Sequence, residues 1–427
     1  MIDDQAEGEL PEGFCVLPWI NLHVATTGAI SPCCEFGGEI ANLSASTLSD
    51  AWRSDELAAI RKAFIDGVPL KACDKCVDRE RSEGNSLRLN SNRQFADWGE
   101  AIAAADAPLE AAPEHPAAFD LRFSNLCNFK CRSCWHGASS KWYADGRAIG
   151  VTLSDRAEIS SFESVDDFIG QVGPGLPQVE HIYFAGGEPL MMPEHYALLE
   201  RLIALGRTDV RISYNTNMSR TSFRGQSVFD LWKHFPNIDV TASVDAAGTL
   251  GEMVRSGFRW ETFVANVRSL RENVPHAGLT FGITVSVLNI FGLPALLDAL
   301  GRECDASCDE FFLHSLQDPP QYRTQILPAS LKRSVSENFA EYMDRMDVND
   351  PGRDRLRDQL SGILRYMNAE DLSHLLPRFA RVSGKLDALR REETSAYLPE
   401  LAPYLAFGGR RYALGKKLVR LFRLIGR

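Results

Sequence analysis

The sequence lacks several features that would mark other classes of protein. No run of eighteen or more uncharged apolar residues occurs, so there is no candidate for a membrane-spanning helix. The first residues are acidic and lack the basic and apolar stretches of a signal peptide, which predicts a cytoplasmic protein. Basic side chains are outnumbered, 46 against 57 acidic ones, for a net charge of −11. This balance argues against a protein that coats nucleic acid, and we expect no nucleic-acid partner.

Cysteine is also sparse, with ten in 427 residues, which is too few for a small disulfide scaffold. These cysteines are unevenly spread. Eight lie before residue 135, and the other two are Cys304 and Cys308. In a reducing compartment, such clustering indicates metal or iron-sulfur ligation rather than disulfide bonds.

Composition divides the chain into four segments. Residues 1–98 are rich in Cys, Gly and Ser and contain one amphipathic helical stretch from Leu48 to Phe64. Residues 99–118 are nearly all Ala, Glu and Pro, which predicts a linker. Strand-like and helical patterns alternate over residues 119–325, and helical patterns alone continue over residues 326–427.

The prediction of fold class rests on six strand-like runs. Each is separated from the next by a segment with helical spacing of apolar residues, which predicts parallel βαβ units. The runs are 119–123, 181–184, 211–214, 238–244, 279–288 and 310–313. We therefore expect an α/β fold: a partial (β/α)6 TIM-like barrel with its chemistry at the carboxyl ends of the strands. A small cysteine-rich domain should precede this barrel and a helical region should follow it.

The last segment, from Arg410 to Arg427, carries seven basic residues and no acidic one. Its leucines fall on one helical face opposite the cations, a pattern typical of a helix at a membrane surface. This pattern predicts peripheral membrane contact through the C-terminal helix. A terminal helix docked on the protein's own acidic surface explains the pattern equally well.

Three of the cysteines follow the first barrel strand as Cys127, Cys131 and Cys134, with the spacing Cys-x3-Cys-x2-Cys. Three thiolates on one tight loop can hold three corners of a four-iron, four-sulfur cluster and leave the fourth iron open. The alternatives are a zinc site, which normally takes four ligands, and a group of buried structural cysteines. The spacing directly after a strand disfavours both.

This cysteine loop resembles that of the radical S-adenosylmethionine (SAM) superfamily. A second hallmark of that superfamily, Gly-Gly-Glu-Pro, follows the second strand as Gly186, Gly187 and Glu188 with Pro189. Adjacent glycines let the backbone approach a ligand closely. The resemblance implies a cluster that reductively cleaves SAM to a 5'-deoxyadenosyl radical, which abstracts hydrogen from a substrate. It also implies that these three residues line the site of the methionine amino group.

Further residues at strand ends match positions that often contact SAM or substrate in this superfamily. They are Asn215, Asn217, Ser243, Asp245 and Arg255. A single polar residue at a strand end is more often a satisfied turn residue, and Arg255 could equally form a surface ion pair.

The N-terminal segment supplies four more candidate ligands, Cys15, Cys33, Cys73 and Cys76. Four thiolates from a hairpin and a Cys-x2-Cys knuckle fit a structural zinc ribbon. The spacing Cys-x12-Gly-x4-Cys followed by Cys-x2-Cys also resembles the twitch and SPASM domains of radical SAM enzymes. That resemblance implies an auxiliary four-iron, four-sulfur cluster, here in an N-terminal twitch-like domain. Cys34 is either an alternative ligand or a small buried residue.

The resemblance implies chemistry on a peptide or natural product, ending in oxidation, dehydrogenation or crosslinking. It also implies an electron donor such as flavodoxin or ferredoxin. A sugar or lipid-linked glycan substrate is an alternative, with dehydrogenation or epimerisation as the reaction. Cys304 and Cys308 would then be candidate catalytic thiols near the barrel mouth, although helix-end cysteines are usually structural. A non-catalytic metal-binding or electron-transfer module is a further alternative.

Overall fold

The computed structural model describes residues 10–405, and its centre is one nine-stranded sheet. Six consecutive neighbours in this sheet are parallel, as the alternating pattern predicts. They are β4 (Ala118–Leu121), β6 (His181–Phe184), β7 (Arg211–Thr216), β10 (Ile238–Ser243), β12 (Gly278–Val285) and β13 (Phe311–Ser315). Each coincides with one of the six expected runs, so the prediction of a (β/α)6-type α/β fold is confirmed.

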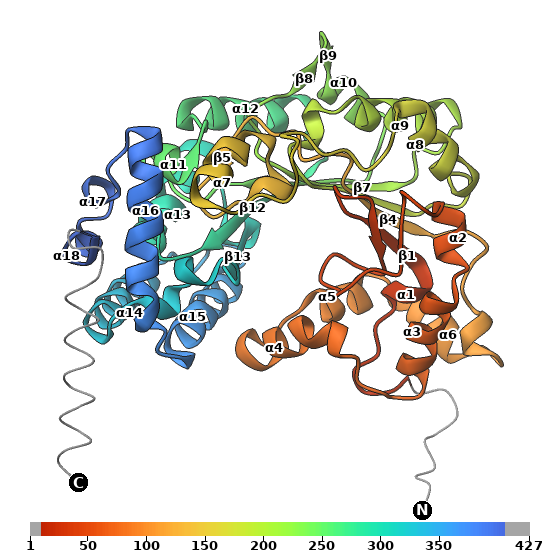
Figure 1. Cartoon of the computed structure of the whole chain (residues 1–427), viewed down its shortest axis with the longest axis horizontal. Helices are drawn as coiled ribbons and strands as arrows, with labels where there is room; N and C mark the ends of the chain where they lie inside the picture. Colours follow the sequence, from red (N-terminus) through yellow and green to blue (C-terminus); the bar gives the residue numbers. More distant parts are fainter. Residues whose placement is uncertain (1–9, 406–427) are drawn as a thin grey trace, which may run out of the picture.

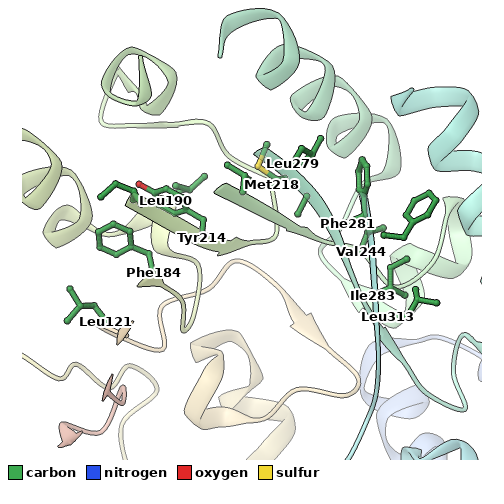
Figure 2. Packing of buried hydrophobic residues seen from close by; sticks show 14 of the residues in the cluster. Leu121, Phe184, Leu190, Tyr214, Met218, Val244, Leu279, Phe281, Ile283 and Leu313 are labelled. Atoms are coloured by element: carbon green, nitrogen blue, oxygen red, sulfur yellow. The ribbon is translucent and has the colours of Figure 1, made fainter. Parts of the chain in front are cut away.

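The helices that connect these strands cover the outer side of the sheet, which Figure 1 shows as an arch. They are α8 (Val165–Val172), α9 (Pro193–Ala204), α10 (Val228–Trp232), α12 (Trp260–Asn273) and α13 (Leu293–Cys304). Two further helices between the strands, α7 (Tyr143–Ile149) and α11 (Gly248–Val254), contact the C-terminal helices instead. Alternation along the strands explains this arrangement. In β10 every second residue is buried, and Val240 and Ala242 are 1% and 0% exposed. Figure 2 shows such apolar side chains, among them Phe184, Tyr214 and Phe281, packed along neighbouring strands.

The opposite face of the strands is polar and only partly buried. Its residues include Ser213, Asn215, Thr241, Ser243 and Thr284. Side chains on this face point toward the inside of the arch, because successive residues of a strand alternate between the two faces. A packed barrel core would carry Val, Ile and Leu here, so the polar lining indicates an interior built to hold something other than protein.

The N-terminal segment is built onto the same sheet. Strand β1 (Asn21–Val24) lies parallel to β4, with Asn21 opposite Ala118 and Val24 opposite Leu121. Strands β2 (Ala29–Ser31) and β3 (Ala41–Asn42) extend the sheet further by antiparallel pairing. The expected hairpin is therefore present, and it adds directly to the barrel sheet.

Helices of the N-terminal segment follow this hairpin. They are α1 (Leu17–Ile20), α2 (Leu48–Trp52), α3 (Asp55–Ile65), α4 (Asp74–Glu83), α5 (Leu87–Gln94) and α6 (Ala96–Ala103). The single amphipathic stretch expected from Leu48 to Phe64 is divided, because the Ser54 hydroxyl accepts a hydrogen bond from Leu57 N–H and begins a new helix. The stretch interpreted as a linker is packed: Trp19 and Trp52 donate hydrogen bonds to the Pro108 and Pro113 carbonyls.

The C-terminal region is helical and closes the arch from the far side. Its helices are α14 (Ala329–Asp344), α15 (Arg353–Ala369), α16 (Leu376–Arg390), α17 (Thr394–Tyr397) and α18 (Ala402–Leu405). Helix α15 packs against both β13 and α4, so the C-terminal region meets the N-terminal segment. Among residues 10–405, no helix combines the length and apolarity needed to cross a membrane. The basic stretch from Arg410 to Arg427 lies outside the described residues.

Candidate functional site

The cysteine loop leaves the carboxyl end of β4 and is fixed by its neighbours. Its short strand β5 (Lys130–Cys131) pairs with β11 (Arg255–Ser256), so that Arg255 lies directly opposite Cys131. Asn125, which is fully buried, donates to the carbonyls of His136 and Ala157 at 2.7 and 3.0 Å. The loop is therefore held in place by backbone pairing and by a buried amide.

The three thiols of this loop lie within electrostatic reach of one another. Burial, together with the neighbouring Cys131, raises the pKa of Cys127 to about 12. Burial also raises the pKa of Cys134, and Cys131 and Cys127 contribute to this increase. Arg255 opposes these shifts at all three thiols. A cation near three thiols favours their thiolate forms, which are the forms that bind metal.

The two glycines after β6 pack directly onto this loop. Gly187 has φ +52°, and a Cβ there would lie 2.3 Å from the Leu126 carbonyl oxygen. A Cβ on Gly186 would lie 2.7 Å from Cβ of Arg122. Glu188 N–H donates to the same Leu126 carbonyl at 2.8 Å. No residue larger than glycine fits this contact, which explains the adjacent pair.

The Glu188 carboxylate ties the end of β7 to the glycine segment. It accepts hydrogen bonds from the Thr216 hydroxyl at 2.6 Å and from Asn217 N–H at 2.7 Å. Burial raises its pKa although these donors oppose the shift. Asn217 in turn donates to Asn128 Oδ1 at 3.0 Å, and its Nδ2 lies 3.9 Å from Cys127 Sγ. The structure thus brings Glu188, Asn217 and Cys127 together.

Asp245 and Arg255 form a second link to the loop. Arg255 Nη1 lies 3.0 Å from Asp245 Oδ2, and Asp245 Oδ1 accepts from Thr284 N–H at 3.0 Å. Both side chains are largely buried, so this is not the surface ion pair that was the alternative. Arg255 Nε is buried without a hydrogen-bond partner in the part of the chain that is described. Asn215 and Ser243 lie on the inner face of the sheet, Asn215 exposed and Ser243 half-buried.

Four thiols of the N-terminal segment also share one environment. Burial raises the pKa of Cys15 to about 12, and Cys76 and Cys73 add to the shift. Burial likewise raises the pKa of Cys33, with further contributions from Cys15 and Cys76. Among residues 10–405, no three Cys, His, Asp or Glu side chains are close enough together to form a single-metal site.

Cys34 belongs to a different group. Burial raises its pKa to about 12, and the next contributions come from Asp120 and Arg122 on the barrel side. It therefore lies at the border between the N-terminal segment and the barrel, within electrostatic reach of Cys33 on one side and of Asp120 and Arg122 on the other.

Two models of known protein families match parts of this chain. Residues 121–295 match the model of the radical SAM superfamily. They form a radical SAM domain. Residues 15–77 match the SPASM iron-sulfur cluster-binding domain. The radical SAM domain implies a four-iron, four-sulfur cluster and SAM, and the SPASM match supports an auxiliary cluster. Members of the radical SAM superfamily are enzymes.

Solved structures with similar folds include two that bind SAM. Native anSMEcpe with bound AdoMet is 14% identical, with a TM-score of 0.37, and the match covers 53% of this chain and 59% of that one. Streptococcus suis SuiB bound to S-adenosylmethionine is 14% identical, with a TM-score of 0.36, covering 65% of this chain and 60% of that one. The chain thus spans about three fifths of their length. No curated protein matches the sequence.

The residues of the radical SAM domain fit the groups that the match implies. The buried Cys127 and the half-buried Cys131 and Cys134 lie near Arg255, which has an unpartnered buried nitrogen, and Gly187 packs without a side chain on the same loop. Cys127, Cys131 and Cys134 would hold the cluster, and the glycine segment would adjoin SAM.

Cys304 and Cys308 lie elsewhere. Cys304 ends α13 and Cys308 begins the turn before β13, so both precede the amino end of that strand. The cysteine loop follows the carboxyl end of the parallel strand β4. Burial raises the pKa of each of the two thiols to about 12. The structure does not bring them to the cysteine loop.

A polar row on the inner face was missed by sequence reasoning. His23, Asp120, Tyr183 and Ser213 lie side by side on four neighbouring strands. His23 Nδ1 lies 3.1 Å from Asp120 Oδ2, and Arg122 pairs with the same carboxylate at 3.3 Å. The signal was present in the sequence, because Asp120 and Arg122 alternate with apolar residues in the first strand.

Proposed function

We propose that this protein is a radical SAM enzyme that abstracts hydrogen from a peptide or natural-product substrate and oxidises, dehydrogenates or crosslinks it. With its cluster and SAM bound, the site would supply a 5'-deoxyadenosyl radical. The observation that carries the proposal is the direct packing of the glycine segment on the cysteine loop, through Gly187 and the Glu188–Leu126 hydrogen bond. This packing joins the two hallmarks of the superfamily in one contact.

The chain's own residues position this chemistry. Glu188 fixes the end of β7 by accepting from Thr216 and Asn217, and it thereby holds Asn217 beside Cys127. Asp245 orients Arg255 against the cysteine loop. We assign contacts with SAM or substrate to Asn215 and Ser243, because both lie on the inner face. Such fixed polar groups lower the reorganisation that a reaction requires.

The N-terminal segment would hold the auxiliary cluster through Cys15, Cys33, Cys73 and Cys76. It borders the barrel interior, since Arg79 and Glu35 lie within electrostatic reach of His314 on β13. A cluster with four protein ligands has no open iron for substrate, so we assign it to electron transfer from the substrate radical. This role agrees with an oxidative outcome.

The substrate is proposed from the same features. The polar inner face, with its row from His23 to Ser213, suits a substrate with amide, hydroxyl or charged groups. An external one-electron donor such as flavodoxin or ferredoxin would reduce the cluster at the cysteine loop. We place the reaction in the cytoplasm, because cysteine thiolates that hold iron-sulfur clusters stay reduced in that compartment.

Anaerobic reconstitution tests the proposal. The full chain would be loaded with iron and sulfide, reduced with dithionite and mixed with SAM, and 5'-deoxyadenosine would be measured. We expect 5'-deoxyadenosine from the wild type and none from Cys131→Ala. A wild-type protein that holds its clusters, binds SAM and still forms no 5'-deoxyadenosine with any peptide tested would contradict the proposal.

A further inference from the structure

The cysteine loop meets the C-terminal region in a buried network of charged side chains. Arg132, which lies between Cys131 and Cys134 in the sequence, is 0% exposed. Its Nη2 donates to Asp387 Oδ1 and to Glu392 Oε2, both at 2.6 Å. Asp387 lies on α16 and Glu392 follows that helix. One side chain of the loop therefore reaches into the C-terminal region.

A second ion pair crosses the same boundary in the opposite direction. Arg390, the last residue of α16, donates through Nε to Asp145 Oδ2 on α7 at 2.8 Å. The same carboxylate lies 3.4 Å from Nζ of Lys130 in the cysteine loop. The side chains of Arg390 and Asp145 are only 1% and 7% exposed. Arg132 of the loop thus pairs with acids on and after α16, and Arg390 of α16 pairs with Asp145 on α7.

The network is anchored at both ends. On the loop side, Arg132 N–H donates to the Val254 carbonyl at 2.8 Å, next to the pairing of Cys131 with Arg255. On the helix side, Asp387 accepts from the hydroxyl and the backbone N–H of Thr394, at 2.8 and 3.0 Å. A shift of α16 would therefore move the backbone that carries Cys131 and Cys134.

Stability alone explains this network poorly. Removing paired charges from water costs about as much free energy as their attraction returns, and apolar residues of similar volume often stabilise a fold better. Within residues 10–405, Nε and Nη1 of Arg132 and both Nη atoms of Arg390 lack hydrogen-bond partners. Such a network is better suited to fixing a geometry and a local charge than to adding stability.

We infer that α16 and the residues after it form a clamp on the cysteine loop, in which Arg132 and Arg390 are positioning residues for the iron-sulfur cluster. This inference rests on the proposed assignment of Cys127, Cys131 and Cys134 as its ligands. Helix α16 and the residues after it lie outside both family matches, which cover residues 121–295 and 15–77. It gives the helical C-terminal region a direct part in holding the cluster.

The test uses the reconstituted full chain with Asp387→Asn and, separately, Arg132→Lys. Two quantities are measured: the rate at which a chelator removes iron, and the midpoint potential of the loop cluster followed by electron paramagnetic resonance. We expect Asp387→Asn to lose the loop cluster about tenfold faster, because partners beyond the ligands commonly change metal retention by this much. The potential should rise, since Arg132 then loses part of its counter-charge. For Arg132→Lys, the rate of iron loss and the midpoint potential should both lie between those of Asp387→Asn and the wild type.

Three controls separate the possible outcomes. Asp298→Asn breaks an exposed ion pair with Arg345 at 2.6 Å and should behave as wild type. The auxiliary cluster of the same molecule should be retained in Asp387→Asn. If both clusters leave at the same increased rate, or if Asp387→Asn matches wild type in rate and potential, the clamp is overturned. A Cys127, Cys131 and Cys134 triple alanine variant that keeps the loop-cluster signal would instead overturn the proposed ligands.

Discussion

The two cysteine sites differ in how the chain assembles them. In the cysteine loop, three thiols lie between Cys127 and Cys134, and the elements around them belong to distant segments. In the N-terminal segment, the four thiols themselves come from distant segments, between Cys15 and Cys76. The first site has local ligands and long-range support, whereas the second has long-range ligands. The loop therefore depends on its neighbours for orientation, and the N-terminal site depends on the folding of its whole segment.

Each site also has one arginine with an acidic partner. Arg255 lies beside all three loop thiols and pairs with Asp245. Arg88 lies beside Cys15 and Cys73, pairs with Glu80 and donates to the Gly13 carbonyl at 2.6 Å. In each group, an arginine paired with an acid limits the charge that accumulates on the thiolates.

The largest effect should come from Gly187→Ala, which tests the support of the loop. Because a Cβ would lie 2.3 Å from the Leu126 carbonyl, the loop must shift by about an ångström. We expect 5'-deoxyadenosine formation to fall about 100-fold, the loss that a displacement of this size commonly causes. The control is Gly206→Ala, which has φ +71° and no atom within 4 Å of its Cβ. Equal losses in both variants would show that backbone strain, not the contact, is responsible.

A smaller effect should follow when each arginine loses its partner. Asp245→Asn should lower 5'-deoxyadenosine formation about tenfold, as the loss of a residue behind a metal site commonly does. Glu80→Gln should leave this reaction unchanged and accelerate chelation of iron from the N-terminal site. Both 5'-deoxyadenosine formation and the rate of iron chelation from the N-terminal site should be measured in both variants. If either variant changes both quantities, the two sites do not each depend on their own arginine.

A still smaller effect on SAM cleavage is expected from Cys76→Ala. Loss of this ligand should remove about four irons per chain, the content of one cubane cluster. Cleavage of SAM without substrate should change little, because the cysteine loop keeps its own contacts with Gly187 and Arg255. Iron analysis and 5'-deoxyadenosine assays measure the two properties, and Cys131→Ala gives the opposite pattern if the sites are independent.

No effect on SAM cleavage is expected from Cys304→Ala. This thiol lies before the amino end of β13, whereas the cysteine loop lies at the carboxyl end of the parallel strands. The same result is expected for Cys308→Ala. If either variant alters the yield of 5'-deoxyadenosine while its melting temperature stays at the wild-type value, a role for that thiol in the reaction would be indicated.

The barrel could be predicted from the sequence because the patterns that indicate its strands and helices are local. Each of the six strands is a short apolar run followed by a helical pattern, and the cysteine loop from Cys127 to Cys134 is contiguous in sequence. The position of β1 beside β4 could not be predicted, since parallel pairing between segments so far apart leaves no local pattern. The same holds for Arg132, whose partner Asp387 lies 255 residues away.

Local polar residues were harder to interpret. The sequence singled out Asn217 and Glu188, which the structure brings together, but Thr216, which also donates to Glu188, resembles any other strand residue. Cys34 adjoins Cys33 in the sequence, yet its neighbours Asp120 and Arg122 belong to the barrel. In a strand or turn, adjacent residues point in different directions, so adjacency in sequence does not establish a shared site.

The parallel pairing of β1 with β4 has a consequence for the order of folding. During synthesis, β1 emerges long before β4, and until β4 emerges one edge of β1 has no partner. Unpaired strand edges are sites of aggregation, and contacts between distant segments form late. A nascent chain would therefore carry an exposed edge until the barrel's first strand leaves the ribosome. Expression of the N-terminal segment alone should yield insoluble protein, and slower translation before residue 118 should favour aggregation.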